Sequence, residues 1–229
     1  CTIDNETFLL LQFAEQCYQI SDGLFDITSG VLRKVWRFDG SDNVPTQHDI
    51  SALLPYIGWQ KIALNQSTFQ MLPGMEIDLG GLGKEYAVDK AVLIAKQMSD
   101  HPVLINFGGD IRVAGEKADN SDFIIAVTNP KDQAQVLFAL PLKQQALTTS
   151  AHYARRYQFA DQNTSHILAA EDTNDKVISV TVVANTALQA GIFSTALTIN
   201  PFLELPENMG YALIDDQLTI HQNTDFLNS

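Results

Sequence analysis

A glycine-rich run with a charged residue at each end is the first segment that could do chemistry. It begins at Asp78 and ends at Lys84, with glycine at positions 80, 81 and 83. Glycine lets a ligand approach the backbone closely, amides at a helix start favour phosphate, and lysine adds a positive charge. The glycine spacing matches neither a P-loop nor a dinucleotide-binding turn. The run therefore fits phosphate binding, and it also fits an ordinary turn from a strand to a helix.

Two further turns combine small residues with groups that could hold a ligand. Gly108 and Gly109 precede Asp110 after an apolar run, so a ligand could lie against this backbone, although a tight turn fits as well. In the turn that starts at residue 21, Phe25 could stack on a flat heteroaromatic ring and Asp26 could accept its hydrogen bonds. The alternative is that Phe25 lies in the core and Asp26 caps the next element.

Hydroxyl and imidazole groups gather in the C-terminal half of the chain. His166 follows Ser165 in a strand-like run, where it could act as a general base near neutral pH. Gly191 and Thr195 are about one helical turn apart, so a hydroxyl on that face could bind a metal or a phosphate. Each feature has a structural alternative, because a strand histidine can be part of the core and a helix glycine can serve close packing. The five histidines show no zinc-binding spacing.

Three helices and many short strands must position these groups. Apolar residues at spacings of three and four predict a helix over 6–20, a second is expected over 84–98, and a third follows Thr186 and runs to about 199. Residues 39–48 are expected to form a loop. The predicted strands are a hairpin at 61–72 and runs at 77–79, 103–105, 111–114, 123–128, 135–140, 145–149, 153–159, 165–169 and 177–184, with two more ending near 221. Helices interrupt clusters of strands without a regular βαβ order, which favours an α+β fold.

Length and composition narrow the functional classes. The chain carries 14 Lys and Arg against 27 Asp and Glu, a net charge of −13, which argues against a nucleic-acid surface. No run approaches the roughly 20 apolar residues of a membrane span. The two cysteines, Cys1 and Cys17, do not make a disulfide framework. A single domain over residues 1–229 fits best, and the sequence does not indicate an oligomeric state.

The order of these segments along the chain resembles the ApbE family, the FAD:protein FMN transferases. The resemblance covers roughly residues 6–200 and rests on the segments above together with 35–38, 86–89, 148–150 and 190–197. It implies a T-fold-like α+β architecture with mixed, mostly antiparallel sheets packed with helices. It also implies FAD as substrate, Mg²⁺ as cofactor, and transfer of FMN to a Thr or Ser hydroxyl of a target flavoprotein with release of AMP.

The resemblance also gives roles to individual residues. Asp78 and Lys84 would contact FAD, and Lys84 would help to neutralise charge on the phosphates during transfer. His166 would be the catalytic base that activates the acceptor hydroxyl. The other positions would line the FAD site (Leu24, Phe25, Asp26, Gly108, Gly109 and Asp110) or bind the metal (Gly81, Ser194 and Thr195).

Three features depart from the family pattern. The family has an aspartate four residues before the helix threonine, and that position here is Gly191. Because Mg²⁺ usually takes one or two carboxylates, the change should weaken the metal unless another acid, such as Asp110 or Asp172, replaces it. The glycine that follows the family's lysine is here Glu85, which is unfavourable near a pyrophosphate unless it points away. In the family turn that begins at His166, the histidine is kept, whereas the aspartate, proline and glycine are not.

These departures leave alternatives open. The chain could be an active Mg²⁺-dependent flavin transferase with a rearranged metal site, or a non-catalytic FAD-binding paralogue that has lost the metal carboxylate. It could also be an interaction domain that keeps only the fold. The resemblance implies an N-terminal strand segment that this sequence does not contain, and Cys1 is either a lipidation site or the end of a trimmed chain. By resemblance we expect the periplasm or cell envelope, with the cytoplasm as the alternative.

Overall fold

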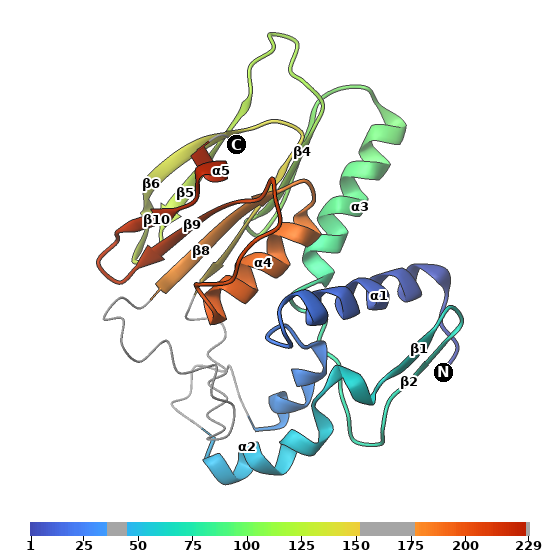
Figure 1. Ribbon diagram of the computed structural model, residues 1–229. Coiled ribbons are helices and arrows are strands. Elements are labelled where there is room, and N and C mark those ends of the chain that lie inside the picture. Colours follow the sequence, from blue (N-terminus) through green and yellow to red (C-terminus); the bar gives the residue numbers. More distant parts are fainter. Residues whose placement is uncertain (36–44, 152–176, 228–229) are drawn as a thin grey trace. The chain divides into compact units, whose positions relative to one another are not determined.

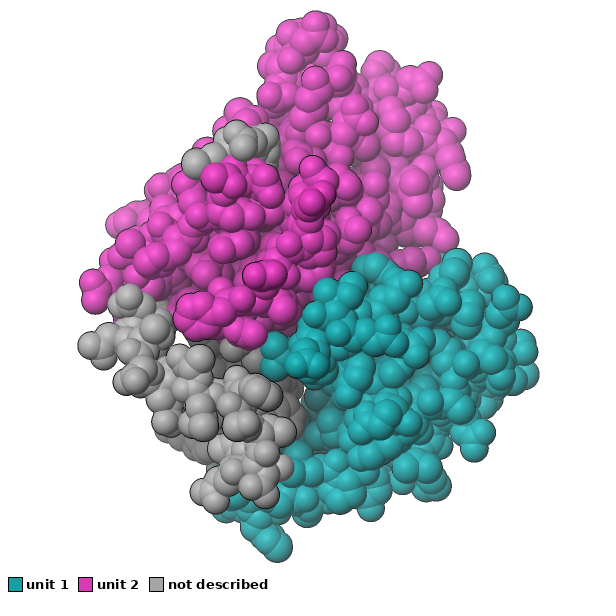
Figure 2. Space-filling view, in the orientation of Figure 1, with its two compact units in different colours: residues 1–81 teal, residues 82–229 magenta. Residues whose placement is uncertain are grey.

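The computed structural model describes residues 1–35, 45–151 and 177–227 (Figure 1). The chain divides into two compact units, residues 1–81 and 82–229, which Figure 2 colours separately. The sequence predicted a single domain over residues 1–229. Whether the two units together form that single domain stays a prediction. Within the described ranges, none of the helices combines the length and apolar character needed to cross a membrane.

The first unit is mostly helical. Its elements are α1 (Asn5–Ile20), α2 (Gln47–Leu53), the 3-10 helices η1 (Ile27–Lys34), η2 (Leu54–Tyr56) and η3 (Trp59–Lys61), and the antiparallel hairpin of β1 (Ala63–Asn65) and β2 (Thr68–Gln70). Asp4 caps α1 by accepting a hydrogen bond from the Thr7 amide at 2.8 Å. On its apolar face α1 buries Leu11, Ala14 and Cys17, three residues apart as one helical face requires. Burial raises the pKa of the Cys17 thiol to about 12, so this thiol is unreactive in the folded chain.

The second unit is built on one antiparallel sheet of six strands in the order β10-β9-β8-β7-β4-β3. These strands are β3 (Val103–Phe107), β4 (Asp110–Ala114), β7 (Ala146–Ala151), β8 (Val177–Ala184), β9 (Gly210–Asp215) and β10 (Ile220–Gln222). A separate antiparallel hairpin pairs β5 (Phe123–Asn129) with β6 (Asp132–Leu142). The helices of this unit are α3 (Gly83–Met98), α4 (Ala187–Ile199) and the short α5 (Thr224–Leu227).

Alternating side chains of β8 give the two faces of the sheet different partners. On one face, Val180 and Val182 pack against α4 residues that include Phe193. On the other face, Val183 packs with the β5–β6 hairpin and with Phe226 of α5. Figure 1 shows the same arrangement, with α3 and α4 on one side of the sheet. Both faces are therefore covered, which explains why β8 is buried continuously from Ser179 to Ala184 rather than at alternate residues.

The structure confirms the predicted α+β class, since every strand pairing among the described residues is antiparallel and helices pack on the main sheet. The helices expected over 6–20, 84–98 and up to 199 are α1, α3 and α4. The hairpin expected at 61–72 is β1–β2, and the last two strands are β9 and β10. Strands predicted at 153–159 and 165–169 lie outside the described residues.

Two local predictions were wrong. Residues 77–79 form no strand, because the Asp78 amide donates to the Ile27 carbonyl at 2.7 Å and holds this segment against η1 rather than in a sheet. The end of the predicted loop 39–48 belongs to α2, which begins at residue 47. There Thr46 and Asp49 form a capping box, a signal that is visible in the sequence.

Asp215 at the end of β9 makes the second unit sensitive to acid. Its buried carboxylate accepts from the amides of Gln217 and Thr219 at 2.9 and 2.7 Å, and lies 3.0 Å from His221 Nε2. Burial alone would raise the pKa of Asp215, but the hydrogen bonds from His221 and these amides outweigh it and lower the pKa below 3.8. The ionised carboxylate therefore stabilises the fold above pH 3.8, and this contribution is lost as the pH falls through the lowered pKa.

We expect Asp215→Asn to reduce the free energy of unfolding by about 1–3 kcal/mol at pH 7, because a neutral amide replaces a charged acceptor of several hydrogen bonds. The gap between wild type and variant should shrink as the pH drops below 3.8. Urea titrations at pH 7, 5 and 3 would measure it. A gap that stays constant over this range would contradict the assigned charge state.

Candidate functional site

A salt bridge at the start of α3 joins two of the predicted site residues. Lys84 in the first turn of α3 donates to the carboxylate of Asp110, the first residue of β4. The Asp110 side chain is 6% exposed and the Lys84 side chain is 56% exposed, so a buried acid holds an accessible ammonium group. Leu82, the residue before the helix, offers no side-chain oxygen to cap it. A helix N-terminus with a fixed cation favours an anionic ligand such as phosphate.

The predicted glycine turn before Asp110 is a tight hairpin. Phe107 pairs with Asp110, and Gly108 and Gly109 between them have φ of +65° and +101°, which strongly favours glycine. The Asn106 side-chain oxygen accepts from the Gly109 amide at 2.9 Å and fixes the turn. A Cβ atom added at either glycine would meet no described atom within 4 Å. The tight-turn interpretation is therefore correct, and the open backbone also leaves room for a ligand.

Four hydroxyl groups meet between β7 and α4. The Ser150 hydroxyl lies 2.8 Å from Ser194 and 3.4 Å from Thr195, and Thr148 donates to Ser194 at 3.3 Å. Ser194 in turn donates to the Gly191 carbonyl at 3.0 Å. Thr148 and Ser194 are buried, whereas Thr195 is partly exposed. The predicted metal residues Ser194 and Thr195 thus belong to a compact set of oxygen atoms, which are the ligands that Mg²⁺ prefers.

Glu85 packs against Gly191, whose carbonyl accepts the hydrogen bond from Ser194. It is 6% exposed, and a Cβ atom added at Gly191 would meet Glu85 Cγ at 2.6 Å and Oε1 at 3.1 Å. The Glu85 side chain therefore fills the volume that any side chain at position 191 would occupy. From the sequence, Glu85 is unfavourable near a pyrophosphate unless it points away, and in the structure its side chain packs on α4. Among the described residues, no three His, Cys, Asp or Glu side chains gather as metal ligands.

Asp89, one turn further along α3, fixes the start of α4. Its carboxylate accepts from the amides of Ala187 and Leu188, both at 3.0 Å, and from Arg112 at 2.7 Å. The side chains of Asp89 and Arg112 are only 13% and 20% exposed. A negative charge at a helix N-terminus is stabilising, so Asp89 ties α4 to α3 and β4. The sequence analysis placed Asp89 in the family pattern but gave it no role.

In the first unit, Asp26 and Phe25 have structural contacts. Asp26 caps η1, accepting from the amide and hydroxyl of Thr28 at 2.8 and 2.7 Å. Thr28 accepts from the Gly58 amide at 2.7 Å. Phe25 is 7% exposed, and its amide donates to Ser21. These contacts match the structural alternative for this turn, and contact of Leu24, Phe25 and Asp26 with FAD stays a prediction.

Asp78 lies against the same helix. One carboxylate oxygen accepts from the Gly80 amide at 2.7 Å, and the other is 4.0 Å from Arg33. Gly30 permits this approach, because a Cβ atom there would lie 2.8 Å from both the Asp78 nitrogen and the Ile77 carbonyl carbon. The structure thus brings Asp26 and Asp78 together through η1.

We expect Gly30→Ala to destabilise the first unit by about 1–3 kcal/mol, since the added methyl group meets backbone that cannot move aside easily. Gly83→Ala is the matched control, because a Cβ atom there has no described atom within 4 Å. That variant should be neutral or slightly more stable, as alanine suits a helix better than glycine. Thermal unfolding of both variants would measure the effect, and equal melting temperatures would refute the close approach at Gly30.

Several predicted site residues cannot be joined to Lys84, Asp110 and Thr195. His166 lies outside the described residues, and so does Asp172. Gly81 and the FAD-side residues up to Asp78 belong to the first unit, while Lys84, Asp110 and Thr195 belong to the second. Their roles together therefore stay predictions.

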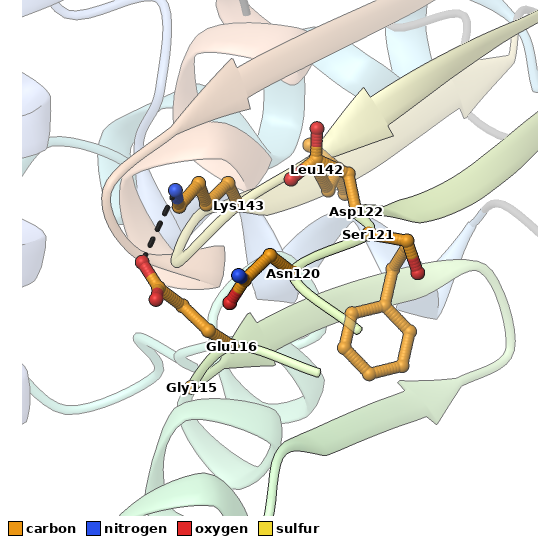
Figure 3. Close-up of a pocket in the computed structure, with 8 residues that line it drawn as sticks. Gly115, Glu116, Asn120, Ser121, Asp122, Leu142 and Lys143 are labelled. Carbon is orange, nitrogen blue, oxygen red and sulfur yellow. Dashed lines mark ion pairs between the residues drawn. The ribbon is translucent and has the colours of Figure 1, made fainter. Parts of the chain in front are cut away.

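A small pocket elsewhere in the second unit contains none of these residues. It is lined by 115–116, 120–123 and 142–143, where the ends of β4, β5 and β6 meet (Figure 3). Glu116 and Lys143 form an ion pair of 3.1 Å across its edge. Both side chains are more than half exposed, so the pair contributes little energy and this pocket supports no catalytic role.

Comparison with known proteins identifies the family. The sequence model of the ApbE family matches residues 1–217. The chain belongs to the ApbE family. It is 31% identical over 205 residues to a FAD:protein FMN transferase of Klebsiella pneumoniae, and 28% identical over 191 residues to one of Escherichia coli. These alignments cover 86% and 78% of this chain but only 63% and 54% of the two relatives. The chain therefore spans more than half, but less than two thirds, of their length.

Solved ApbE structures confirm the fold. The ApbE protein of Thermotoga maritima matches 99% of this chain with a TM-score of 0.82 at 28% identity, and the match covers 78% of that protein. The flavin transferase ApbE of Vibrio cholerae matches with a TM-score of 0.78 at 23% identity, covering 99% of this chain and 77% of that one. The second likeness concerns the fold alone. The ApbE fold thus extends across both compact units of this chain.

Proposed function

We propose that this ApbE-family chain binds FAD and transfers its FMN portion to a Thr or Ser hydroxyl of a target flavoprotein, with release of AMP. The observation that carries the proposal is Lys84, an accessible ammonium group held by the buried Asp110 at the start of α3. The names of the relatives in Klebsiella and Escherichia support the same reaction. We also propose the bacterial envelope as its location, on family resemblance alone.

The proposed reaction breaks the phosphoanhydride bond between the two phosphates of FAD and forms a phosphoester bond to the acceptor. The acceptor hydroxyl oxygen attacks the FMN phosphorus of FAD, and the bond from that phosphorus to the bridging oxygen breaks. AMP leaves with the bridging oxygen, and the hydroxyl proton passes to a base, for which His166 is the proposed residue. Negative charge spreads over the phosphoryl oxygens in the transition state, and the Lys84 ammonium group can stabilise it there.

The oxygen donors of the second unit fit a magnesium ion. The hydroxyls of Ser194 and Thr195, supported by Ser150, would hold it. Bound Mg²⁺ would supply further positive charge for the phosphoryl oxygens. Asp110 keeps Lys84 in place, so it is a positioning residue and is already engaged with a cation. It is therefore a poor replacement for the carboxylate that Gly191 cannot provide.

A second function, FAD binding without transfer, is favoured by Gly191 alone. An FAD titration of the purified chain with and without Mg²⁺, followed by AMP detection in the same samples with an acceptor peptide, separates the two. The proposal expects FAD binding and metal-dependent AMP release. Binding without AMP would favour the non-catalytic paralogue, and no flavin binding would refute both.

A further inference from the structure

Two changes of residue type meet at one point in the structure. The resemblance to the ApbE family implies glycine at the position of Glu85 on α3 and aspartate at the position of Gly191 on α4, and this chain departs from both. The structure packs the two against each other, with the Glu85 Oε1 atom 3.1 Å from where a Cβ atom of residue 191 would lie. The Glu85 side chain on α3 therefore occupies the space that a side chain at position 191 of α4 would need.

The two positions are sterically coupled. A side chain at 191 would collide with Glu85 Cγ at 2.6 Å, so glycine is the residue that tolerates Glu85. Glycine within a helix is less favourable than alanine, which is a reason for its absence elsewhere in α4. At position 191 the lower helix propensity of glycine is tolerated because only glycine leaves room for the Glu85 side chain.

The Glu85 side chain packs against Gly191, which lies on the face of α4 that carries Ser194 and Thr195. Gly191, Ser194 and Thr195 are three and four residues apart and therefore share one face of α4. The Ser194 hydroxyl donates to the Gly191 carbonyl, and the Ser150 hydroxyl lies within 3.4 Å of both Ser194 and Thr195. A buried carboxylate beside hydroxyl oxygens is a donor set for a hard divalent cation that keeps several of its waters.

We propose that Glu85 supplies the carboxylate of the divalent-cation site, in place of the side chain that position 191 lacks, with Thr195 as its partner on α4. The proposal rests on the proposed function for the identity of the cation, Mg²⁺. A free Glu85 carboxylate next to Lys84 would repel a pyrophosphate. As a metal ligand, the same carboxylate would instead help to hold the cation that the pyrophosphate needs. The chain then retains its metal site by relocating one carboxylate.

Binding of Mn²⁺ alone, measured by the electron paramagnetic resonance signal of free Mn²⁺, tests this proposal without requiring activity. The wild-type chain should bind Mn²⁺, and Glu85→Gln, which keeps the shape and removes the charge, should lower the affinity on the order of tenfold or more. Glu116→Gln, at an exposed carboxylate of the same unit, is the matched control and should bind like wild type.

A double variant tests the relocation itself. Gly191→Asp alone should be poorly folded, because its side chain collides with Glu85. Combined with Glu85→Gly, it should regain stability and Mn²⁺ binding, which makes the two changes strongly non-additive. Circular dichroism melts of every variant would show which of them are folded.

The outcomes separate this inference from the proposed function. Loss of Mn²⁺ binding in Glu85→Gln with recovery in the double variant supports the relocated site, even if no AMP is released from FAD. Wild-type Mn²⁺ affinity in Glu85→Gln overturns it, even if AMP release depends on metal. Absence of Mn²⁺ binding by the wild-type chain, or by a folded double variant, overturns it as well.

Discussion

Asp89→Ala is expected to lower the free energy of unfolding by about 3–5 kcal/mol, because it leaves a largely buried Arg112 without its acid. The same change removes the acceptor for the amides of Ala187 and Leu188 at the start of α4. Urea denaturation followed by far-ultraviolet circular dichroism would measure the loss. Since α4 carries Ser194 and Thr195, the loosened helix should also weaken binding of divalent cations.

Asp119→Ala provides the matched control for Asp89. Asp119 also accepts two hydrogen bonds, from the amide and hydroxyl of Ser121, but it is exposed in a turn. Water can replace those bonds, so this variant should unfold much closer to wild type. If the two alanine variants unfolded at the same urea concentration, Asp89 would not be the tie between α3 and α4 that the distances indicate.

Lys84→Met should slow the release of AMP from FAD by about 100-fold or more, which is the usual effect of removing one group that stabilises transition-state charge. Methionine is also unbranched and only one atom shorter than lysine, and it carries no charge. Because the lost contact strengthens in the transition state, the turnover number should fall more than the affinity for FAD. Single-turnover AMP release together with FAD binding would measure both quantities.

Lys143→Met is the control for Lys84. Its side chain is 58% exposed against 56% for Lys84, and it also pairs with a carboxylate, Glu116. It should release AMP at the wild-type rate. Lys84→Arg should recover part of the activity, because it restores a positive charge that Asp110 can hold. Wild-type AMP release by Lys84→Met would remove Lys84 from the proposed mechanism.

The fold could be predicted largely from the sequence, because its elements have strong periodic signals. The regular apolar spacing of α1 and the β-branched run of β8 identified both elements close to their true ends. The errors arose where local pattern and three-dimensional contact disagree. The apolar residues at 77–79 look like a strand but pack against η1 through Asp78 and Gly30.

The site was only partly predictable, because its key contacts join residues far apart in the sequence. Lys84 and Asp110 were both predicted, but as separate FAD contacts rather than as an ion pair. The sequence identified Glu85 and Gly191 as departures from the family pattern. Glu85 was expected to be unfavourable near a pyrophosphate, and Gly191 was expected to weaken metal binding. That the first compensates for the second follows only when α3 packs on α4, since no local pattern connects the two helices.

The most direct test of the proposed function is the stoichiometry of transfer. The chain would be incubated with FAD, Mg²⁺ and an acceptor flavoprotein, and AMP would be quantified alongside covalently bound FMN on the acceptor by mass spectrometry. The account predicts equal amounts of both products, and neither product when the acceptor hydroxyl is removed by a Thr→Val change. Bound FAD with no AMP above background, in the presence of metal and acceptor, would contradict it.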